Sequence, residues 1–293
     1  MRLALATSAN LPGWEVDDHP FHDALRRRGI SFELGVWDDL TFDWSHFDTC
    51  LIRTTWDYHE RRDAFVQWAK ERANHQRFFN PPQVIAWNSH KGYLRELAEA
   101  GIPLAPTEWL AKGSTVDAAA LVRDKGWAQA FLKPTVGLCA SDTLRFNADE
   151  DGFRAAQEHL ETHLPEGDFI LQPYLKRVEV DGEISALFFG GEFSHAVQKI
   201  PVPGDYRVQD DWGATDKPIS MHSEHKALAS RIIKTAEEIL GCSLLYARVD
   251  LMFDDKAQLV LTELELIEPS LFFRHGPQGP DLLVDALLKG SDS

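Results

Sequence analysis

The sequence is poor in cysteine and has no long apolar run. Its three cysteines, Cys50, Cys139 and Cys242, lie far apart and in no spacing typical of a metal site. That usage excludes a disulfide framework and favours a reduced, cytoplasmic protein. No apolar stretch approaches the about 18 residues of a transmembrane helix, and the short apolar start has no clear cleavage site. We therefore expect neither a membrane span nor a signal peptide.

Positive charge is also scarce. The 293 residues include 30 Lys and Arg against 46 Asp and Glu, which gives a formal net charge of −16. Such a surface repels phosphate backbones, so we expect no nucleic-acid partner. The sequence also lacks a P-loop, a G-x-G-x-x-G fingerprint and the G-x-S-x-G motif of serine hydrolases. The simplest nucleotide and nucleophile sites are thereby excluded.

What is present is an alternation of strands and helices. Short apolar stretches at 2–7, 31–37 and 49–54 predict strands, and a capped helix at 19–29 lies between the first two. This rhythm indicates a parallel sheet. A further helix is expected to start at Asn88-Ser89 and to end at Gly101.

The later part of the sequence predicts antiparallel pairing. Strands are expected at 128–134 and 168–175. A hairpin at 183–199 turns at Gly190-Gly191, a pair that suits a two-residue primed turn. A strong helix at 223–241 precedes a second hairpin at 244–267. The predicted fold class is therefore α+β, or mixed α/β.

The second hairpin carries a group of acids. Strand side chains alternate between faces, and an even-length loop makes Arg248 oppose Glu263. Asp250, Glu263 and Glu265 then share one face beside Arg248. Three carboxylates without His or Cys form an oxygen site that suits Mg²⁺ or Mn²⁺ rather than zinc. A solvated face with a salt bridge to Arg248 is the alternative. Glu268 has the opposite parity, and we expect it to be solvated.

Two lysines precede this hairpin in positions that suit phosphate binding. Lys91 falls in the first turn of the helix from residue 88, where a solvated lysine gains nothing from the helix dipole. Lys133 ends an apolar strand and is followed by a loop that contains Gly137 and Ser141. Backbone N–H groups and hydroxyls of such a loop can bind phosphate. Taken singly, each lysine fits a surface cation better.

The strand at 168–175 runs into a candidate hinge. Gln172, Tyr174 and Leu175 surround a proline and can offer backbone groups to an adenine ring. Glu179 and Glu183 follow, and either can accept hydrogen bonds from ribose hydroxyls. An edge strand that is stopped by the proline is the alternative interpretation.

The segment after the third strand is a candidate substrate site. Ligands of open parallel sheets bind beyond the carboxyl ends of the strands, where Arg53, Thr54 and Asp57 lie. Arg53 can pair with a carboxylate and Asp57 with an ammonium. A polar loop around a core Trp56 explains the same residues equally well.

Two further cations follow the first hairpin. Lys199 ends its second strand and Arg207 lies in the loop beyond, and either can meet phosphate or a substrate carboxylate. We place Lys199 in the candidate catalytic set and Arg207 in the substrate set. The loop at 201–218 is long and rich in Gly and Pro, which is typical of a lid.

The order of these features resembles the ATP-grasp superfamily over residues 85–275. The segments "ARVDLM" and "LTELELIEPS" are similar to the metal hairpin of D-alanine–D-alanine ligase and glutathione synthetase. Those families usually have Asn where this chain has Glu265, a departure that leaves the number of metal ions open. "IRTTWDY", "FSHAVQKIPVPGDYRVQ" and "ELELIEPSLFF" resemble, more narrowly, the small ATP-grasp ligases that include the D-cycloserine-forming cyclo-ligase.

The resemblance implies ATP and Mg²⁺ (or Mn²⁺) as cofactors and assigns a role to each candidate. Lys91 and Lys133 would hold the ATP phosphates, residues 172–175 would line the adenine, and Glu179 or Glu183 would bind the ribose. Arg248 would stabilise the negative charge of the transition state. The metal would be held by Asp250, Glu263 and Glu265.

The implied reaction is ATP-dependent ligation of an amino-acid-like small molecule, as in antibiotic biosynthesis. A carboxylate is activated as an acylphosphate, and an amine or aminooxy group of the same or another molecule displaces phosphate. A non-catalytic nucleotide-binding protein and a metal-dependent hydrolase are the alternatives. The resemblance further implies a homodimer and three lobes, at 1–88, 89–173 and 174–293.

Overall fold

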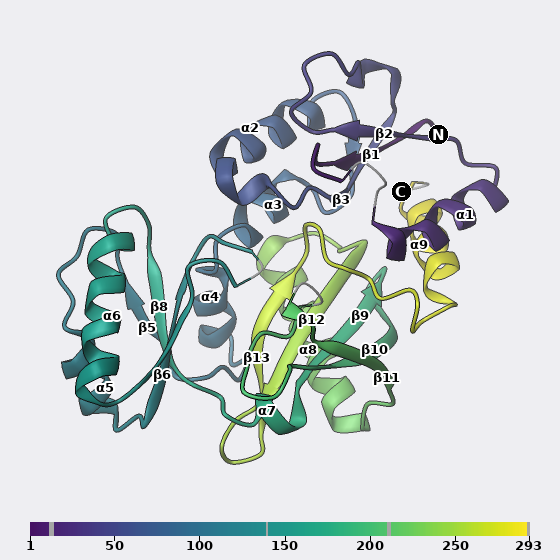
Figure 1. The fold of residues 1–293 in the computed structure, drawn as a ribbon. Helices are drawn as coiled ribbons and strands as arrows, with labels where there is room; N and C mark the ends of the chain where they lie inside the picture. The colour runs from purple at the N-terminus through teal and green to yellow at the C-terminus, as the bar shows by residue number, and fades with distance from the viewer. Residues whose placement is uncertain (12–14, 139, 210–211, 292–293) are drawn as a thin grey trace.

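The structure is a computed structural model that describes residues 1–11, 15–138, 140–209 and 212–291 (Figure 1). Its strands form three separate sheets, one near the N-terminus, one in the middle of the chain and one that spans the C-terminal part. We call them the N-terminal, central and C-terminal sheets. The mixed α+β class expected from the sequence is confirmed.

The N-terminal sheet is parallel, as the strand–helix rhythm predicts. Its strand order is β2-β1-β3-β4, and every pairing is parallel. The strands are β1 (Leu3–Thr7), β2 (Phe32–Val36), β3 (Thr49–Thr54) and β4 (Arg77–Phe78). The helices around it are α1 (His19–Arg27), α2 (Arg62–Ala73) and α3 (Pro82–Asn88), with short 3-10 turns at Val16–Asp18, Trp44–His46 and Tyr58–Arg61.

The central sheet is antiparallel and has the order β5-β8-β6-β7. Helices α5 (Ala118–Lys125) and α6 (Glu150–His163) pack on it and share its apolar core, as the left of Figure 1 shows. The strands are β5 (Glu108–Leu110), β6 (Gln129–Pro134), β7 (Leu144–Asn147) and β8 (Phe169–Pro173).

The C-terminal sheet has the order β11-β10-β9-β12-β13 and is antiparallel throughout. Gly190 and Gly191 both have positive φ angles, which confirms the predicted primed turn between β9 and β10. The strands are β9 (Glu183–Phe189), β10 (Glu192–Ile200), β11 (Thr215–Ile219), β12 (Tyr246–Phe253) and β13 (Leu259–Glu265), and the helices are α4 (Tyr93–Glu99), α7 (Val178–Asp181), α8 (Ser223–Leu240) and α9 (Gly279–Ser291).

Two helices pack away from the neighbours that their sequence positions imply. α4 shares the core of α8 and the C-terminal sheet through Tyr93, Leu94 and Leu97. α9 packs against α1 of the N-terminal lobe. The three-lobe division at residues 88 and 173 stays a prediction. Within the part of the chain that the structure describes, no helix is long and apolar enough to span a membrane.

The helix predicted from Asn88-Ser89 starts later than expected. Asn88 ends α3, and α4 begins only at Tyr93. The side chain of Asn88 binds the backbone at the end of β13: it donates to the Leu264 carbonyl and accepts from the Leu266 N–H, both at 2.8 Å. It therefore caps a strand edge rather than a helix. Lys91 lies in the turn before α4 and not in a first helical turn.

The register of the second hairpin differs from the prediction, although the shared face is correct. The loop spans 254–258 and so has an odd length, and a bulge follows at Thr262. The two irregularities cancel: Asp250 pairs with Glu263, and Arg248 pairs with Glu265 rather than with Glu263. A bulge adds one residue to one strand, which restores the parity that the odd loop had changed.

Candidate active site

Strand β13 is fixed from both sides, and this sets the positions of its acids. β12 pairs with one edge, and side chains from α3 and α4 bind the other. The Tyr93 hydroxyl accepts from the Leu264 N–H at 3.0 Å, next to the two hydrogen bonds of Asn88. The edge groups of Leu264 and Leu266 thus have partners, as buried backbone groups require. Glu263 and Glu265 are held on the opposite face to Leu264.

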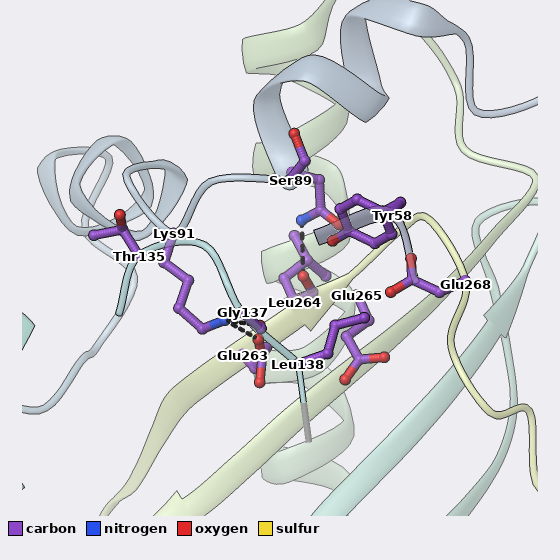
Figure 2. A pocket seen from close by; sticks show the side chains of 11 residues that line it. Tyr58, Ser89, Lys91, Thr135, Gly137, Leu138, Glu263, Leu264, Glu265 and Glu268 are labelled. Carbon is purple, nitrogen blue, oxygen red and sulfur yellow. Dashed lines mark hydrogen bonds and ion pairs between the residues drawn. The ribbon is translucent and has the colours of Figure 1, made fainter. Parts of the chain in front are cut away.

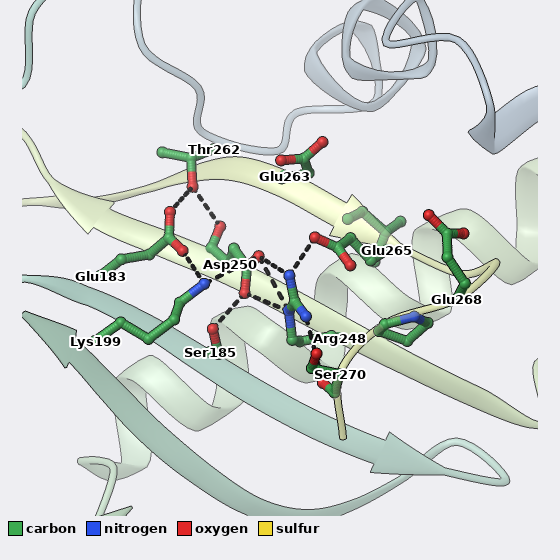
Figure 3. A network of polar contacts seen from close by, with 12 residues as sticks. Glu183, Ser185, Lys199, Arg248, Asp250, Thr262, Glu263, Glu265, Glu268 and Ser270 are labelled. Carbon is green, nitrogen blue, oxygen red and sulfur yellow. Dashed lines mark hydrogen bonds and ion pairs between the residues drawn. The ribbon is translucent and has the colours of Figure 1, made fainter. Parts of the chain in front are cut away.

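A buried network of charges covers the face of β12 and β13 (Figure 3). Arg248 forms ion pairs with Asp250, at 3.0 Å, and with Glu265. The Ser185 hydroxyl on β9 donates to Asp250 at 2.5 Å. Arg248 and Asp250 are both more than nine-tenths buried. Arg248 therefore lies beside Asp250 and Glu265 on the face where the sequence predicts it.

Lys199 joins this network from β10. Its ammonium pairs with Glu183, the first residue of β9, and lies 3.7 Å from Asp250. Thr262, at the bulge, donates to Glu183 at 3.4 Å and to the Asp250 carbonyl at 3.0 Å. The bulge thus turns a hydroxyl towards the carboxylates. Lys199 therefore lies with Arg248, as the candidate catalytic set requires.

A small polar pocket lies beside the network (Figure 2). Its lining comes from 88–91, from 135–138, from 263–268 and from Tyr58. Lys91 reaches across it to Glu263, at 2.9 Å, and donates to the Gly137 carbonyl at 3.1 Å. Lys133 donates to the Thr262 carbonyl at 3.4 Å. Both predicted phosphate lysines thus point to the acidic hairpin.

Of the two loop residues after Lys133 that were predicted to bind phosphate, Gly137 and Ser141, only Gly137 lines the pocket. Gly137 lines the pocket through its backbone. Ser141 is exposed, and its hydroxyl donates to Asp142 at 3.3 Å. Cys139 lies outside the described residues. In this arrangement the loop offers the pocket a backbone segment rather than the Ser141 hydroxyl.

Burial and charge shift the pKa values of the site in opposite directions. Burial raises the pKa of Glu265 to about 7 in spite of Arg248. Burial also acts to raise the pKa of Asp250, but Arg248 and Lys199 more than offset it, so the pKa is lowered. Burial lowers the pKa of Lys133 to about 8. The pKa values of the Glu265 carboxylate and the Lys133 ammonium are therefore closer to neutral than those of ordinary Glu and Lys side chains.

The donor set suits a hard cation, but the ligands are not gathered. Asp250, Glu263 and Glu265 supply only oxygen, which Mg²⁺ prefers. Among the described residues, no three His, Cys, Asp or Glu side chains lie close enough together to hold a metal. The cations of the chain itself occupy these oxygens, Lys91 on Glu263 and Arg248 on the other two. The metal assignment stays a prediction.

The hinge residues lie at the end of β8, a strand of the central sheet, and just beyond it. The Tyr174 hydroxyl donates to Glu179 at 2.8 Å, and Arg145 binds both residues at 3.2 Å. Gln172 donates to the Thr107 hydroxyl at 2.7 Å, and Leu175 is half-buried. Glu179 thus lies at the hinge, whereas Glu183 lies in the charge network. The choice of ribose ligand between these two remains open.

The predicted substrate residues do not line the pocket. Arg53 is 1% exposed and binds Asp18 through two hydrogen bonds, at 2.9 and 3.0 Å. The Thr54 hydroxyl shares a hydrogen bond with Thr7, and Asp57 accepts from the Trp37 indole at 2.9 Å. Strand β3 ends deep in the core, so these groups face internal partners. Asp18 is an ion-pair partner and makes no helix cap through its side chain.

The predicted lid is in contact with the central sheet, although it is shorter than expected. Thr215–Ile219 is strand β11, so the loop ends before residue 215. The Tyr206 hydroxyl shares a hydrogen bond with Thr143 at 2.9 Å, and Arg145 donates to the Gly204 carbonyl at 3.3 Å. Arg207 pairs with Asp205 at 2.6 Å and contacts no residue of the pocket in these interactions. Residues 210 and 211 lie outside the described part.

Sequence reasoning missed Glu268 and Asn88. Glu268 was expected to be solvated, yet it is 6% exposed and lines the pocket. The strand ends at Glu265, so alternation does not extend to Glu268. The adjacent pair Leu266 and Ile267 is the available signal: both are buried, which an alternating strand with one solvated face does not allow.

Comparison with known proteins agrees with this geometry. Residues 3–80 match the family described as the N-terminal domain of D-cycloserine synthetase DcsG. The cycloserine biosynthesis protein DcsG of Streptomyces lavendulae is 32% identical, over 97% of this chain and 97% of that protein. The crystal structure of D-cycloserine synthetase DcsG superposes with a TM-score of 0.89, at 30% identity and 99% coverage of both chains.

A more distant structure has the same fold. D-alanine–D-alanine ligase from Bacillus anthracis, solved with ATP, has a TM-score of 0.67 at 15% identity, over 99% of this chain and 96% of that one. Together these matches span the whole chain, and the resemblance inferred from the hairpin and the lysines is confirmed. The chain therefore belongs to the family of the D-cycloserine synthetase DcsG, and it shares its fold with ATP-grasp ligases.

Proposed function

We propose that this protein uses ATP to activate the carboxylate of an amino-acid-like small molecule as an acylphosphate, which an amine or aminooxy group of the same molecule then attacks. The product would be D-cycloserine or a close analogue, with ADP and phosphate released. The supporting observation is the cross-strand pair Asp250–Glu263 with Arg248, Lys199 and Lys91 around it, in a chain that is similar to D-cycloserine synthetase along its whole length.

The chemistry needs positioning and charge neutralisation more than a covalent protein group. In the first step a carboxylate oxygen bonds to the γ-phosphorus, and ADP leaves with the electron pair of the broken P–O bond. In the second step the nitrogen bonds to the acyl carbon, the bond from that carbon to the phosphate oxygen breaks, and the nitrogen releases a proton. Both steps concentrate negative charge on oxygen, which cationic side chains stabilise.

The residues take roles that follow from their positions. Lys91 and Lys133 would bind the phosphates, since both ammonium groups already point to the acidic hairpin. Lys199 and Arg248 would neutralise the transferring phosphoryl group. The hinge at 172–175 would take the adenine. Mg²⁺ would be held by Asp250, Glu263 and Glu265, and it would supply positive charge to neutralise the phosphates.

The proposal is tested by ADP release. β-Aminooxy-D-alanine, the open-chain form of D-cycloserine, is offered with ATP and Mg²⁺, and D-alanine serves as a substrate without the nucleophile. We expect ADP and D-cycloserine in equal amounts from the first compound. With ¹⁸O in the carboxylate, one labelled oxygen should appear in phosphate, which is the signature of an acylphosphate.

Two variants and a control make the test specific. Asp250→Asn and Glu263→Gln should abolish turnover, whereas Asp255→Asn in the exposed loop of the same hairpin should leave it unchanged. ATP binding without turnover of any compound would favour a non-catalytic nucleotide-binding protein instead. Full turnover by Asp250→Asn would show that the metal assignment is wrong.

A further inference from the structure

Glu268 is a buried acid whose carboxylate has no hydrogen-bond or ion-pair partner among the described residues. Its side chain lines the pocket and is 6% exposed. Its carbonyl accepts from the Trp56 indole, but no described residue forms a hydrogen bond or an ion pair with its carboxylate. Figure 2 shows the two oxygens pointing into the space between Tyr58 and Glu265. Buried carboxylates normally have a partner, so this one calls for a ligand.

The other two acids of the pocket have cations of their own. Glu263 binds Lys91, and Glu265 binds Arg248. Glu268 is the third carboxylate, and the lining contains no further Lys or Arg among the described residues. Burial, and then the neighbouring Glu265, raise the pKa of Glu268 well above the usual value. A cationic ligand group beside Glu268 would offset both the burial of its carboxylate and the repulsion by Glu265.

We propose that Glu268 binds the α-ammonium group of the substrate and thereby selects α-amino acids. This inference rests on the proposed function and assigns one end of the substrate within the same pocket. An α-amine carries a positive charge at neutral pH, whereas an aminooxy nitrogen is a much weaker base and stays neutral. The ammonium group, and not the nucleophile, is therefore the cation of an aminooxy amino acid.

The position of Glu268 fits this role. It lies beyond the end of β13 and lines the pocket together with Tyr58, while Glu183 and Lys199 lie at the opposite end of the network (Figure 3). A substrate whose ammonium binds Glu268 would direct its carboxylate to the phosphate-binding cations. The Tyr58 ring closes the pocket beside Glu268.

The backbone at Glu268 is held by two residues near the end of β3, Arg53 within the strand and Trp56 just beyond it. The Trp56 indole donates to the Glu268 carbonyl at 3.0 Å, and Arg53 donates to the Pro269 carbonyl at 3.1 Å. Arg53 is itself fixed by Asp18. These are positioning residues, and they explain why a segment without regular structure can present one carboxylate in a defined place.

A pair of compounds tests the proposal directly. β-Aminooxy-D-alanine carries the α-ammonium, and 3-(aminooxy)propanoic acid is the same molecule without it. ADP release is measured with both for the wild-type protein, Glu268→Gln, Glu268→Asp and the exposed control Glu192→Gln. A charge-assisted hydrogen bond is lost with the ammonium, so the wild type should prefer the amino compound by roughly 10- to 100-fold in kcat/KM.

The expected pattern is a loss of selectivity. Glu268→Gln should bring the two kcat/KM values to within a few-fold, mainly by lowering that of the amino compound. Glu268→Asp should retain part of the preference, and Glu192→Gln all of it. An unchanged preference in Glu268→Gln would overturn the proposal. So would an equal loss with both compounds, since that is the result of a purely structural role.

A binding measurement separates this proposal from the proposed function. D-cycloserine and isoxazolidin-3-one, the same ring without the amino group, are titrated into the protein by calorimetry. If no compound supports ADP release, the proposed function fails, but tighter binding of D-cycloserine that is lost in Glu268→Gln still supports the ammonium site. Equal affinities, or no binding of either ring, would overturn it.

Discussion

Arg53 offers a strong test of the structure, because sequence and structure give it different roles. The sequence places it in the substrate site, whereas its guanidinium is buried against Asp18, whose side chain is 2% exposed. Arg53→Met would remove three hydrogen bonds, two to Asp18 and one to the Pro269 carbonyl. It would leave a buried carboxylate without a cation. Breaking such a pair typically costs about 3–5 kcal/mol, and we expect that loss in the free energy of unfolding.

The assay is urea unfolding followed by circular dichroism, with two reference variants. Arg154→Met breaks an exposed pair with Asp151 and should cost less than about 1 kcal/mol. The double variant Arg53→Met/Asp18→Asn removes both charges and should recover most of the loss of the single variant. If Arg53→Met unfolded within about 1 kcal/mol of the wild type and only raised the KM for substrate, Arg53 would be a ligand-binding residue and our reasoning would be refuted.

Three further predictions concern the site. Burial raises the pKa of Glu265 to about 7, so its ionisation lowers the free energy of unfolding as pH rises from about 4.5 through 7. In metal-free buffer, Glu265→Gln should show a smaller loss over this range. At pH 8 it should be more stable than the wild type by about 1–3 kcal/mol. Asn88→Ala leaves the Leu264 carbonyl and the Leu266 N–H without their partner, so the free energy of unfolding should fall by about 2–4 kcal/mol. Tyr206→Phe removes the hydrogen bond to Thr143, and steady-state kinetics should show a few-fold higher KM for ATP if that contact closes the loop; an unchanged KM would mean that the contact has no role in binding.

Local patterns were enough for the parts of the fold that depend on local geometry. Gly190-Gly191 fixes a primed turn because both residues need a positive φ angle. The prediction that Asp250, Glu263 and Glu265 share a face was also correct. The predicted loop length and register of that hairpin were wrong. The bulge at Thr262 restored the parity, and nothing in the sequence near it signals a bulge.

The errors at Asn88, Arg53 and Glu268 all involve partners that are distant in sequence. Asn88 looks like a helix start until its amide is seen to bind β13, some 176 residues away. Arg53 looks like a surface cation of a ligand site until Asp18 is seen beside it. Glu268 follows a strand whose alternation has ended, so its burial depends on how the segment after β13 crosses the core. Pattern reasoning has access to none of these contacts.

The charge network explains how the site can be stable without ligands and still accept the ATP and the cation of the proposed reaction. Each acid of the network is paired with a cation of the chain: Lys91 with Glu263, Arg248 with Asp250 and Glu265, and Lys199 with Glu183. In the proposed reaction the phosphates take the lysines, and Mg²⁺ takes the carboxylates. Pairs within the chain are then exchanged for pairs with the ligands. Either ligand alone would leave buried charges of one sign without partners, so the two should bind best together. Glu268 stands outside this exchange because none of the described cations forms an ion pair with it, and that is why we assign it to the substrate rather than to the nucleotide.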